Sequence, residues 1–151
     1  MATKSATEHA SAVLVGARAV LIRGPSGSGK SRLAFELMQA SRVLSLFARL
    51  VADDRAYVEA VGGHLLVRPT EALAGLIEVR GVGILRLAHE PCAVVGLTVD
   101  LAAADAARMP QEDSRKTEIA GIVVPRLPVA ADEAAMPAVL ALITSSADAW
   151  I

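Results

Sequence analysis

Two different periods of apolar residues follow one another near the start of the chain. Ala19–Ile22 is a short apolar run with β-branched members, which is typical of a buried strand. In residues 31–38, Leu33, Leu37 and Met38 recur on one face of a helix. A glycine-rich segment separates the two patterns. The sequence therefore predicts a strand, a loop and a helix, in this order.

Most of the remaining apolar runs are predicted strands. We expect strands at Ser11–Val15, Phe47–Ala52, Tyr57–Val61, His64–Val67, Leu76–Val79, Ala93–Leu101 and Ile119–Val124, and a terminal helix at Pro137–Ile143. Gly16-Ala17-Arg18 and Gly62-Gly63 are tight turns, so the strands on either side of each form a hairpin. Pro69 and Pro125 are expected to end their strands. Because hairpins outnumber strand–helix–strand units, we expect a mixed or mostly antiparallel sheet.

Composition narrows the class of protein. A chain of 151 residues suits one domain, and with 54% hydrophobic but only 3% aromatic residues its core must consist mainly of Ala, Val, Leu and Ile. The net charge is −1 and the basic residues are scattered, so nothing indicates nucleic-acid binding. Arginines interrupt the apolar runs, and none of the runs is long enough to span a bilayer.

The compartment is predicted from two further features. Residues 1–5 contain no apolar segment of the signal-peptide type. Cys92 is the only cysteine, which excludes an internal disulfide and suits a reducing environment. We therefore expect a cytoplasmic protein that does not enter a membrane.

The glycine-rich segment fits G-x-x-x-x-G-K-[ST] with no mismatch. It consists of Gly24, Pro25, Ser26, Gly27, Ser28, Gly29, Lys30 and Ser31. Gly27 and Gly29 allow the backbone N–H groups to wrap a polyphosphate closely. Lys30 can reach the β- and γ-phosphates, the Ser31 hydroxyl can bind Mg²⁺, and the helix N-terminus adds its positive end. We interpret the segment as a nucleotide phosphate site rather than a chance turn.

Three acidic residues stand next to apolar runs, where they contribute nothing to a core. Asp53-Asp54 ends a strand-like stretch; such acids hold Mg²⁺ or accept the proton of an attacking hydroxyl, and a strand-end acidic turn is the alternative. Glu78 can be a second metal ligand or can point to solvent. Arg80 shares its strand face if the strand continues that far, and there it would stabilise a transferred phosphoryl group. A surface ion pair between Glu78 and Arg80 is the alternative.

The histidines carry weaker signals. His9 lies near the terminus, where a solvated side chain is the usual finding, and neither His64 nor His89 has the spacing of a metal ligand. Gln111–Lys116 is polar and of mixed charge, and we expect a solvated loop there.

Together these segments resemble the catalytic domain of HPr kinase/phosphorylase, the family that phosphorylates a serine of the phosphocarrier protein HPr. The resemblance is carried by His9-Ala10, Gly24–Ser31, Leu50–Arg55, Leu73–Ile84 and, weakly, Ile119–Val129. Its strong part covers about residues 9–86. The run Glu78-Val79-Arg80-Gly81-x-Gly83-Ile84 is the most specific part, because other phosphate-loop kinases do not carry it after an Asp-Asp pair.

The resemblance implies an α/β fold, namely a P-loop domain of the phosphoenolpyruvate carboxykinase-like type with a mixed, hairpin-rich sheet. It implies one catalytic domain over residues 1–151, without the larger N-terminal domain of longer members, and assembly into a homo-hexamer. ATP and Mg²⁺ are the implied cofactors, with Ser31 and Glu78 as Mg²⁺ ligands. The implied catalytic residues are Asp54 as the base, Asp53 in support, His9 beside both, Lys30, Arg80 and Arg108.

Two segments differ from the family pattern. The stretch from Met38 to Leu50 is longer, and Ala130-Ala131-Asp132-Glu133 stands where the family has a loop rich in Arg, Pro, Gly and Asn. We expect a serine kinase of the phosphotransferase system that acts on HPr or a nitrogen-branch homologue, with weak or absent phosphorylase activity. A small-metabolite or nucleotide kinase is an alternative, although such enzymes usually carry an arginine-bearing lid and a parallel sheet. A non-catalytic ATP sensor is another, and it would not need Asp54.

Overall fold

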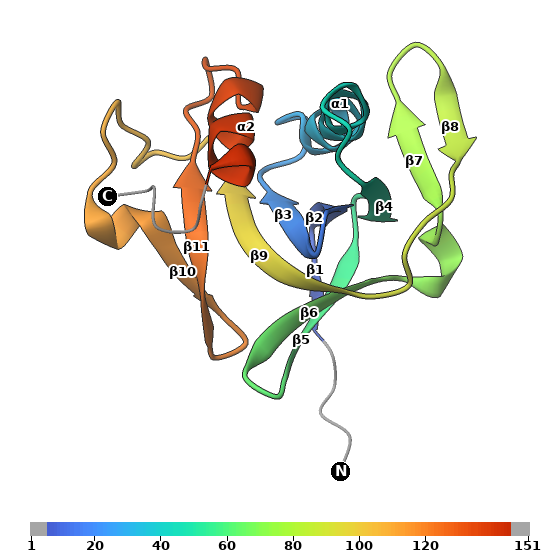
Figure 1. Cartoon of the computed structure of the whole chain (residues 1–151), viewed down its shortest axis with the longest axis horizontal. Helices are drawn as coiled ribbons and strands as arrows, with labels where there is room; N and C mark the ends of the chain where they lie inside the picture. Colours follow the sequence, from blue (N-terminus) through green and yellow to red (C-terminus); the bar gives the residue numbers. More distant parts are fainter. Residues whose placement is uncertain (1–5, 146–151) are drawn as a thin grey trace.

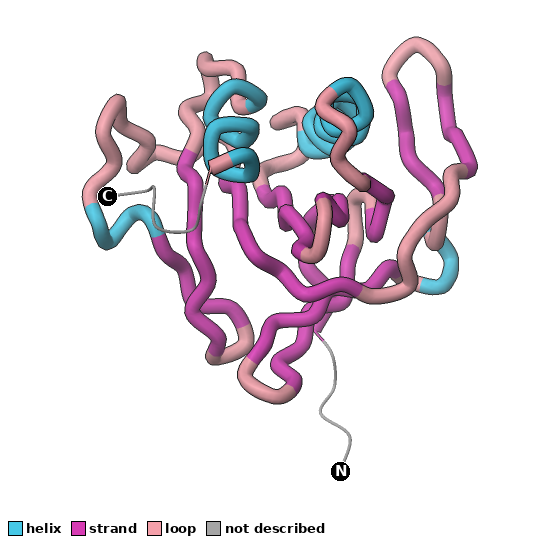
Figure 2. Tube along the Cα trace, in the orientation of Figure 1, coloured by secondary structure: helices cyan, strands magenta, loops and turns pink. Residues whose placement is uncertain are grey.

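The structure, a computed structural model, describes residues 6–145 and consists mainly of strands (Figures 1 and 2). The strands are β1 (Ala6–Glu8), β2 (Ala10–Val15), β3 (Arg18–Arg23), β4 (Ala48–Ala52), β5 (Ala56–Val61), β6 (His64–Pro69), β7 (Leu76–Val79), β8 (Gly83–Arg86), β9 (Ala93–Asp100), β10 (Lys116–Ile119) and β11 (Ile122–Pro128). The helices are α1 (Lys30–Val43) and α2 (Met136–Thr144), with short 3₁₀ turns at Glu71–Leu73 and Glu112–Arg115.

One curled sheet contains nine of these strands. Seven follow the order β1-β5-β6-β9-β3-β2-β4, with β11 beside β9 and β10 beside β11. β3, β9 and β11 run parallel to one another, whereas all other neighbours in the sheet are antiparallel. β9 begins against β6 and continues between β3 and β11 (Figure 1). The predicted mixed, hairpin-rich sheet is confirmed.

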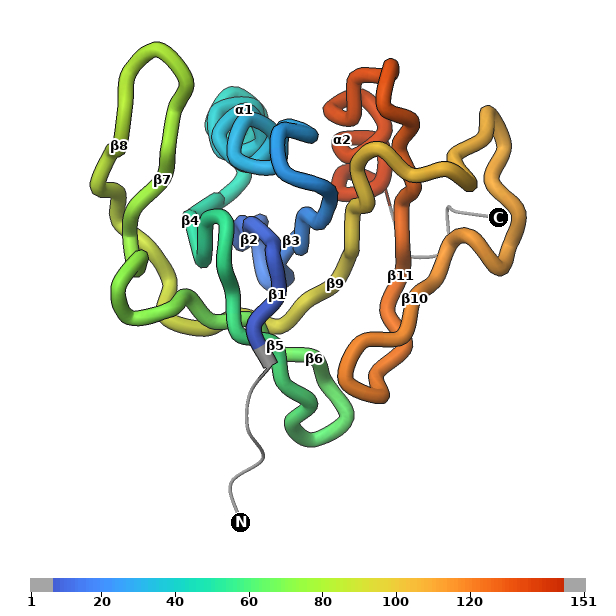
Figure 3. Tube along the Cα trace, turned by 180° about the vertical axis from the view of Figure 1, so that it is seen from behind, coloured from blue at the N-terminus to red at the C-terminus, as the bar shows by residue number. Residues whose placement is uncertain are grey.

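The sheet separates two apolar cores. Helices α1 and α2 cover the same face, as Figures 1 and 3 show from opposite sides. Val20 and Ile22 of β3 belong to the core beneath the helices, while Ala19 and Leu21 belong to the core on the other face. This alternation follows from the two-residue period of a strand. Neither helix in the described part of the chain is long and apolar enough to cross a membrane.

Helix α1 uses the apolar face that its sequence predicts. Leu33, Leu37 and Met38 are all buried, in the same cluster as Ile77 of β7. The β7–β8 hairpin is separate from the large sheet and lies beside α1 in both Figure 1 and Figure 3. This packing places β7 beside the helix that follows the glycine-rich loop.

Two strand predictions are corrected. The single strand expected at Ile119–Val124 is the β10–β11 hairpin, with Ala120-Gly121 as its turn. Pro125 does not end β11, because it forms the last pair with β10 and pairing with β9 begins at Arg126. A missing N–H is tolerated where a strand exchanges partners. The short strands β1 and β8 were not predicted.

Candidate functional site

The phosphate loop (Gly24–Ser31) connects the end of β3 to the start of α1. Gly27 and Gly29 have φ angles of 80° and 99°, in the left-handed region that favours glycine. Gly29 is also the N-cap residue, directly before the first residue of α1, and no side chain caps this helix end. The first turn of α1 contains no acidic residue either. Its N–H groups and positive dipole end are therefore available to an anion.

Gly24 is required by close packing. A Cβ atom at this position would lie 2.5 Å from Ser28 Oγ and 3.1 Å from Leu101 Cβ. The loop therefore folds over its own first residue and against the end of β9. A larger residue at this position would push the loop away from the strands that carry it.

The Lys30 side chain lies across the phosphate loop. Its Nζ donates to the carbonyl oxygens of Gly24 and Pro25, at 2.9 Å and 3.2 Å. The residue is only 8% exposed. This arrangement keeps an ammonium charge against the loop, where it can neutralise phosphate oxygens.

Asp53 is the centre of the polar contacts beside the loop. The carboxylate comes from the turn after β4 and the residue is only 6% exposed. Its Oδ1 accepts hydrogen bonds from Ser31 Oγ at 2.6 Å and from Ser11 Oγ at 2.8 Å. Its Oδ2 accepts one from the Glu78 backbone N–H at 3.1 Å. Asp53 thus joins α1, β2 and β7, and its oxygens are committed to internal donors.

Asp54 has the opposite environment although it is the next residue. It is exposed, and its φ of 66° is in the left-handed region, which is uncommon for a residue other than glycine. Its N–H donates to Ser11 Oγ at 3.2 Å, and its carbonyl oxygen accepts from the Ala10 N–H at 3.1 Å. The second bond places His9, which precedes Ala10 and is exposed, next to the Asp54 backbone.

The Glu78 backbone N–H is bonded to Asp53, so Glu78 lies beside the two aspartates. Its side chain is exposed. Arg80 differs from the expectation. β7 ends at Val79, so Arg80 lies in the turn before β8, and the argument that it shares a strand face with Glu78 does not apply. Arg108 is exposed in the irregular segment after β9. Neither arginine forms a hydrogen bond or ion pair with another described residue.

The side chains present fit a Mg²⁺ ion that shares its ligands with a nucleotide. Ser31 gives its only hydroxyl proton to Asp53, so the oxygen lone pairs are free to face a cation. No three His, Cys, Asp or Glu side chains in residues 6–145 form a group that could hold a metal by themselves. Phosphate oxygens and water would supply the remaining ligands, as is usual for Mg²⁺.

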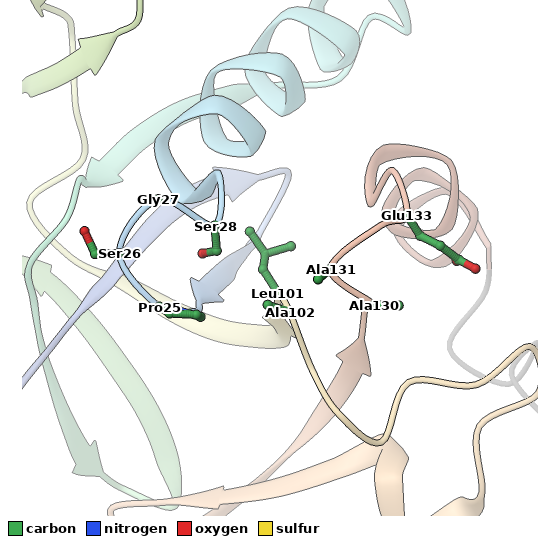
Figure 4. A pocket seen from close by; sticks show the side chains of 9 residues that line it. All are labelled: Pro25, Ser26, Gly27, Ser28, Leu101, Ala102, Ala130, Ala131 and Glu133. Carbon is green, nitrogen blue, oxygen red and sulfur yellow. The ribbon is translucent and has the colours of Figure 1, made fainter.

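A pocket of about 320 Å³ lies between the phosphate loop and the segments that follow β9 and β11 (Figure 4). It is lined by Pro25, Ser26, Gly27, Ser28, Leu101, Ala102, Ala130, Ala131 and Glu133. The small and apolar side chains of the loops after β9 and β11 form the wall opposite the phosphate loop. Figure 4 shows the Glu133 carboxylate directed away from that loop. The pocket can hold the flat, mostly apolar part of a nucleotide whose phosphates enter the loop.

A charged cluster at the ends of the parallel strands was missed by the sequence analysis. Arg23 donates to Asp100 through Nε and Nη2, at 2.8 Å and 2.9 Å, and Arg126 Nε donates to the same carboxylate at 2.6 Å. Arg126 also pairs with Asp105 at 2.7 Å and 3.0 Å. Burial by itself raises the pKa of Asp100, but the two arginines hold it below its ordinary value. Since Arg23 precedes Gly24, the cluster fixes the start of the phosphate loop.

The sequence analysis also missed Ser11. The available signal was a single hydroxyl in the otherwise apolar stretch Ala10–Val15, which was interpreted only as a strand. Asp100 had a comparable signal, an acid at the end of the apolar run of β9. In both cases the partner lies far away in the sequence.

Fold and site together define a phosphate-loop protein with a mixed sheet, in which a buried carboxylate is bonded to the loop serine. The model of the HPr Serine kinase C-terminal domain family matches residues 1–146. The chain therefore belongs to that family.

Individual relatives match shorter stretches. The chain is 49% identical over 67 residues to an HPr kinase/phosphorylase of Streptococcus thermophilus, covering 44% of this chain and 20% of that protein. It is 38% identical over 77 residues to one of Clostridium beijerinckii, covering 51% and 24%. The chain thus spans about a fifth to a quarter of the length of these relatives.

A solved structure shares the fold. The Hpr(Ser) kinase/phosphatase from Coxiella burnetii aligns with a TM-score of 0.71 and 23% sequence identity, over 91% of this chain and 93% of that one. The P-loop fold implied by the resemblance is therefore confirmed.

Proposed function

We propose that the protein is an ATP- and Mg²⁺-dependent kinase that phosphorylates a serine of HPr or of a nitrogen-branch homologue. The observation that carries the proposal is the contrast within the Asp53-Asp54 pair. One carboxylate is buried and bonded to the loop serine, and its neighbour is exposed. The two environments suit two tasks of phosphoryl transfer, one to organise the metal and one to receive a proton.

The phosphate loop would bind the polyphosphate of ATP. The uncapped start of α1 supplies N–H donors, and Lys30 supplies a positive charge at the loop. Ser31 and Glu78 would hold Mg²⁺, which screens the charge of the phosphates when bound. Asp53 keeps the Ser31 hydroxyl oriented by accepting its proton in a hydrogen bond. These groups neutralise charge on the transferred phosphoryl group, which is the main contribution a protein makes to this reaction.

Asp54 would be the general base. Its exposed carboxylate can accept the proton of a serine hydroxyl while the serine oxygen bonds to the γ-phosphorus and ADP leaves. Asp53 is a poor candidate for this step, because three internal donors occupy its oxygens. His9 lies next to the Asp54 backbone and would act on the same step, and Arg80 and Arg108 would approach the phosphates or the carrier from the exposed turns.

The test is phosphoryl transfer to purified carrier proteins. The chain of 151 residues is incubated with γ-labelled ATP, Mg²⁺ and HPr or its nitrogen-branch homologue, and the labelled residue is located by mass spectrometry. We expect label on one serine, no label with Lys30→Ala enzyme, and no label on a carrier whose serine is replaced by alanine. Label on a small metabolite in preference to both carriers would refute the proposal. The expected homo-hexamer is part of the proposal and is tested by light scattering.

A further inference from the structure

Ser11 connects both aspartates to β2 through one hydroxyl group. The residue is 0% exposed. Its Oγ donates to Asp53 Oδ1 at 2.8 Å and accepts from the Asp54 N–H at 3.2 Å. A carboxylate oxygen only accepts and a backbone N–H only donates, so the directions of both bonds are fixed. The single hydroxyl proton is therefore committed to Asp53, and an oxygen lone pair is committed to Asp54.

The backbone of Asp54 depends on this contact. A φ of 66° lies in the left-handed region, which residues other than glycine seldom adopt, so neighbouring contacts help to hold Asp54 in this conformation. Both polar backbone groups of Asp54 are attached to β2, its N–H to Ser11 and its carbonyl oxygen to Ala10. β2 itself is an inner strand of the sheet, paired with β3 on one side and β4 on the other. A rigid strand thus holds a strained turn.

The exposure of Asp54 follows from that turn. Consecutive residues of an extended strand point to opposite faces. Beyond the end of β4 at Ala52, the left-handed conformation of Asp54 turns the backbone away from the strand direction. Asp53 therefore points inward to Ser31, while Asp54 remains exposed. Without the Ser11 hydroxyl, the Asp54 N–H would lose its acceptor and Asp53 would lose one of its three donors.

We propose that Ser11 is a positioning residue, which holds the Asp53-Asp54 turn so that the Asp54 carboxylate stands ready for the substrate hydroxyl. This inference rests on the proposed kinase function. Ser11 touches neither of the reacting groups, so its loss should lower kcat and leave the KM for ATP nearly unchanged. Lys30 and the start of α1, which would bind the polyphosphate, form no hydrogen bond with the Ser11 side chain and should keep their positions.

The chain offers a matched control at Ser41. This serine is also 0% exposed, but it lies in α1 and its hydroxyl has no hydrogen-bond partner among the described residues. Ser41→Ala removes the same atoms from a buried site without breaking a polar contact. Ser11→Thr is the conservative variant, because it keeps the hydroxyl and suits a strand.

The experiment compares the wild type, Ser11→Ala, Ser11→Thr and Ser41→Ala. Transfer from ATP to the carrier gives kcat and KM, and NMR hydrogen exchange reports the Asp54 amide. For Ser11→Ala we expect kcat to fall about 10- to 100-fold with an ATP KM within about threefold of wild type. The Asp54 amide should exchange at least about tenfold faster, since its acceptor is gone. Ser11→Thr should recover most of kcat, and Ser41→Ala should match the wild type in both readouts.

Two outcomes would overturn the inference: unchanged Asp54 exchange in Ser11→Ala, or an equal loss of kcat in Ser41→Ala. If Ser11→Ala does not fold, Ser11→Cys replaces it, because the thiol fills the volume but hydrogen-bonds only weakly. The same losses are then expected. A wild type that transfers no phosphate to any carrier refutes the proposed function instead. In that case the exchange rate of Asp54 still decides whether Ser11 holds the turn.

Discussion

The hydroxyl of Ser31 and the carboxylate of Asp53 form a 2.6 Å hydrogen bond between the start of α1 and the end of β4. The bond joins the last residue of the phosphate loop to an acid 22 positions further along the chain. It orients the serine oxygen and commits one Asp53 oxygen to an internal donor. The proposed division of labour between the two aspartates rests on this contact.

Lys30→Ala is expected to abolish phosphoryl transfer. The substitution removes the ammonium group that Gly24 and Pro25 hold across the phosphate loop. Charge neutralisation and positioning account for most of the catalysis in this chemistry, so transfer should fall to background. The rate is measured with labelled ATP and carrier. Transfer at the wild-type rate would show that the loop is not the phosphate site.

Asp54→Asn should separate binding from chemistry. The amide keeps the shape of the exposed side chain but does not accept the proton, so kcat should fall by about 10²–10⁴ while ATP affinity changes little. Steady-state kinetics and nucleotide titration measure the two quantities.

Asp53→Asn should behave differently from Asp54→Asn. It replaces one acceptor oxygen at a carboxylate that binds Ser31, Ser11 and the Glu78 N–H, and should weaken Mg²⁺-dependent nucleotide binding as well as kcat. A nearly normal Asp54→Asn enzyme beside an Asp53→Asn enzyme that loses only kcat would reverse the assignment of the base.

Asp100→Asn should lower stability in a pH-dependent manner. The arginines hold the pKa of Asp100 in the folded protein below its ordinary value, so the carboxylate stabilises the fold above the unfolded pKa of about 3.9. This contribution is lost as the pH falls through the folded pKa. We expect the variant to lose about 1–3 kcal/mol of unfolding free energy at pH 7, because two partly buried arginines lose a charged partner.

Urea unfolding at pH 7 and near pH 3 measures this difference, which should shrink at the lower pH. Glu36→Gln is the control, since its pair with Arg32 is exposed and should contribute little at either pH. Equal losses at both pH values would mean that the charge of Asp100 is not what stabilises the cluster.

Phosphorylase activity, in which inorganic phosphate attacks phosphoserine to give pyrophosphate, is expected to be weak or absent. That direction needs a second anion beside the phosphate loop, which backbone donors and an arginine fork would hold. The loop opposite is Ala130-Ala131-Asp132-Glu133, which contains two acids and no arginine, and its pocket-lining Glu133 points away from the phosphate loop. Arg126, the nearest arginine along the chain, is committed to Asp100 and Asp105.

The measurement supplies phosphorylated carrier with millimolar phosphate and no ADP, and follows pyrophosphate. Forward transfer by the same preparation is the control for active enzyme. Rapid pyrophosphate release that depends on phosphate would contradict the prediction and would direct attention to Arg108, whose side chain is exposed.

The sequence by itself determined the local elements that the site needs. The apolar run before Gly24, the glycines of the loop and the helical face of Leu33, Leu37 and Met38 are each short-range signals, and the structure bears them out. Hairpins at Gly16 and Gly62-Gly63 were predicted for the same reason, because a two-residue turn fixes the pairing of its own strands. The β10–β11 hairpin was not predicted, because its turn at Ala120-Gly121 lies inside the run Ile119–Val124 that was interpreted as one strand.

Only the tertiary structure decided which carboxylates are buried and what they contact. Ser11 and Asp53 are 42 positions apart, and Arg23 and Asp100 are 77 apart, so no local pattern connects them. They meet because β2 lies between β3 and β4, and because β9 lies parallel to β3. The asymmetry between Asp53 and Asp54 depends on the same packing, since a left-handed residue persists only where neighbouring strands hold both of its backbone groups.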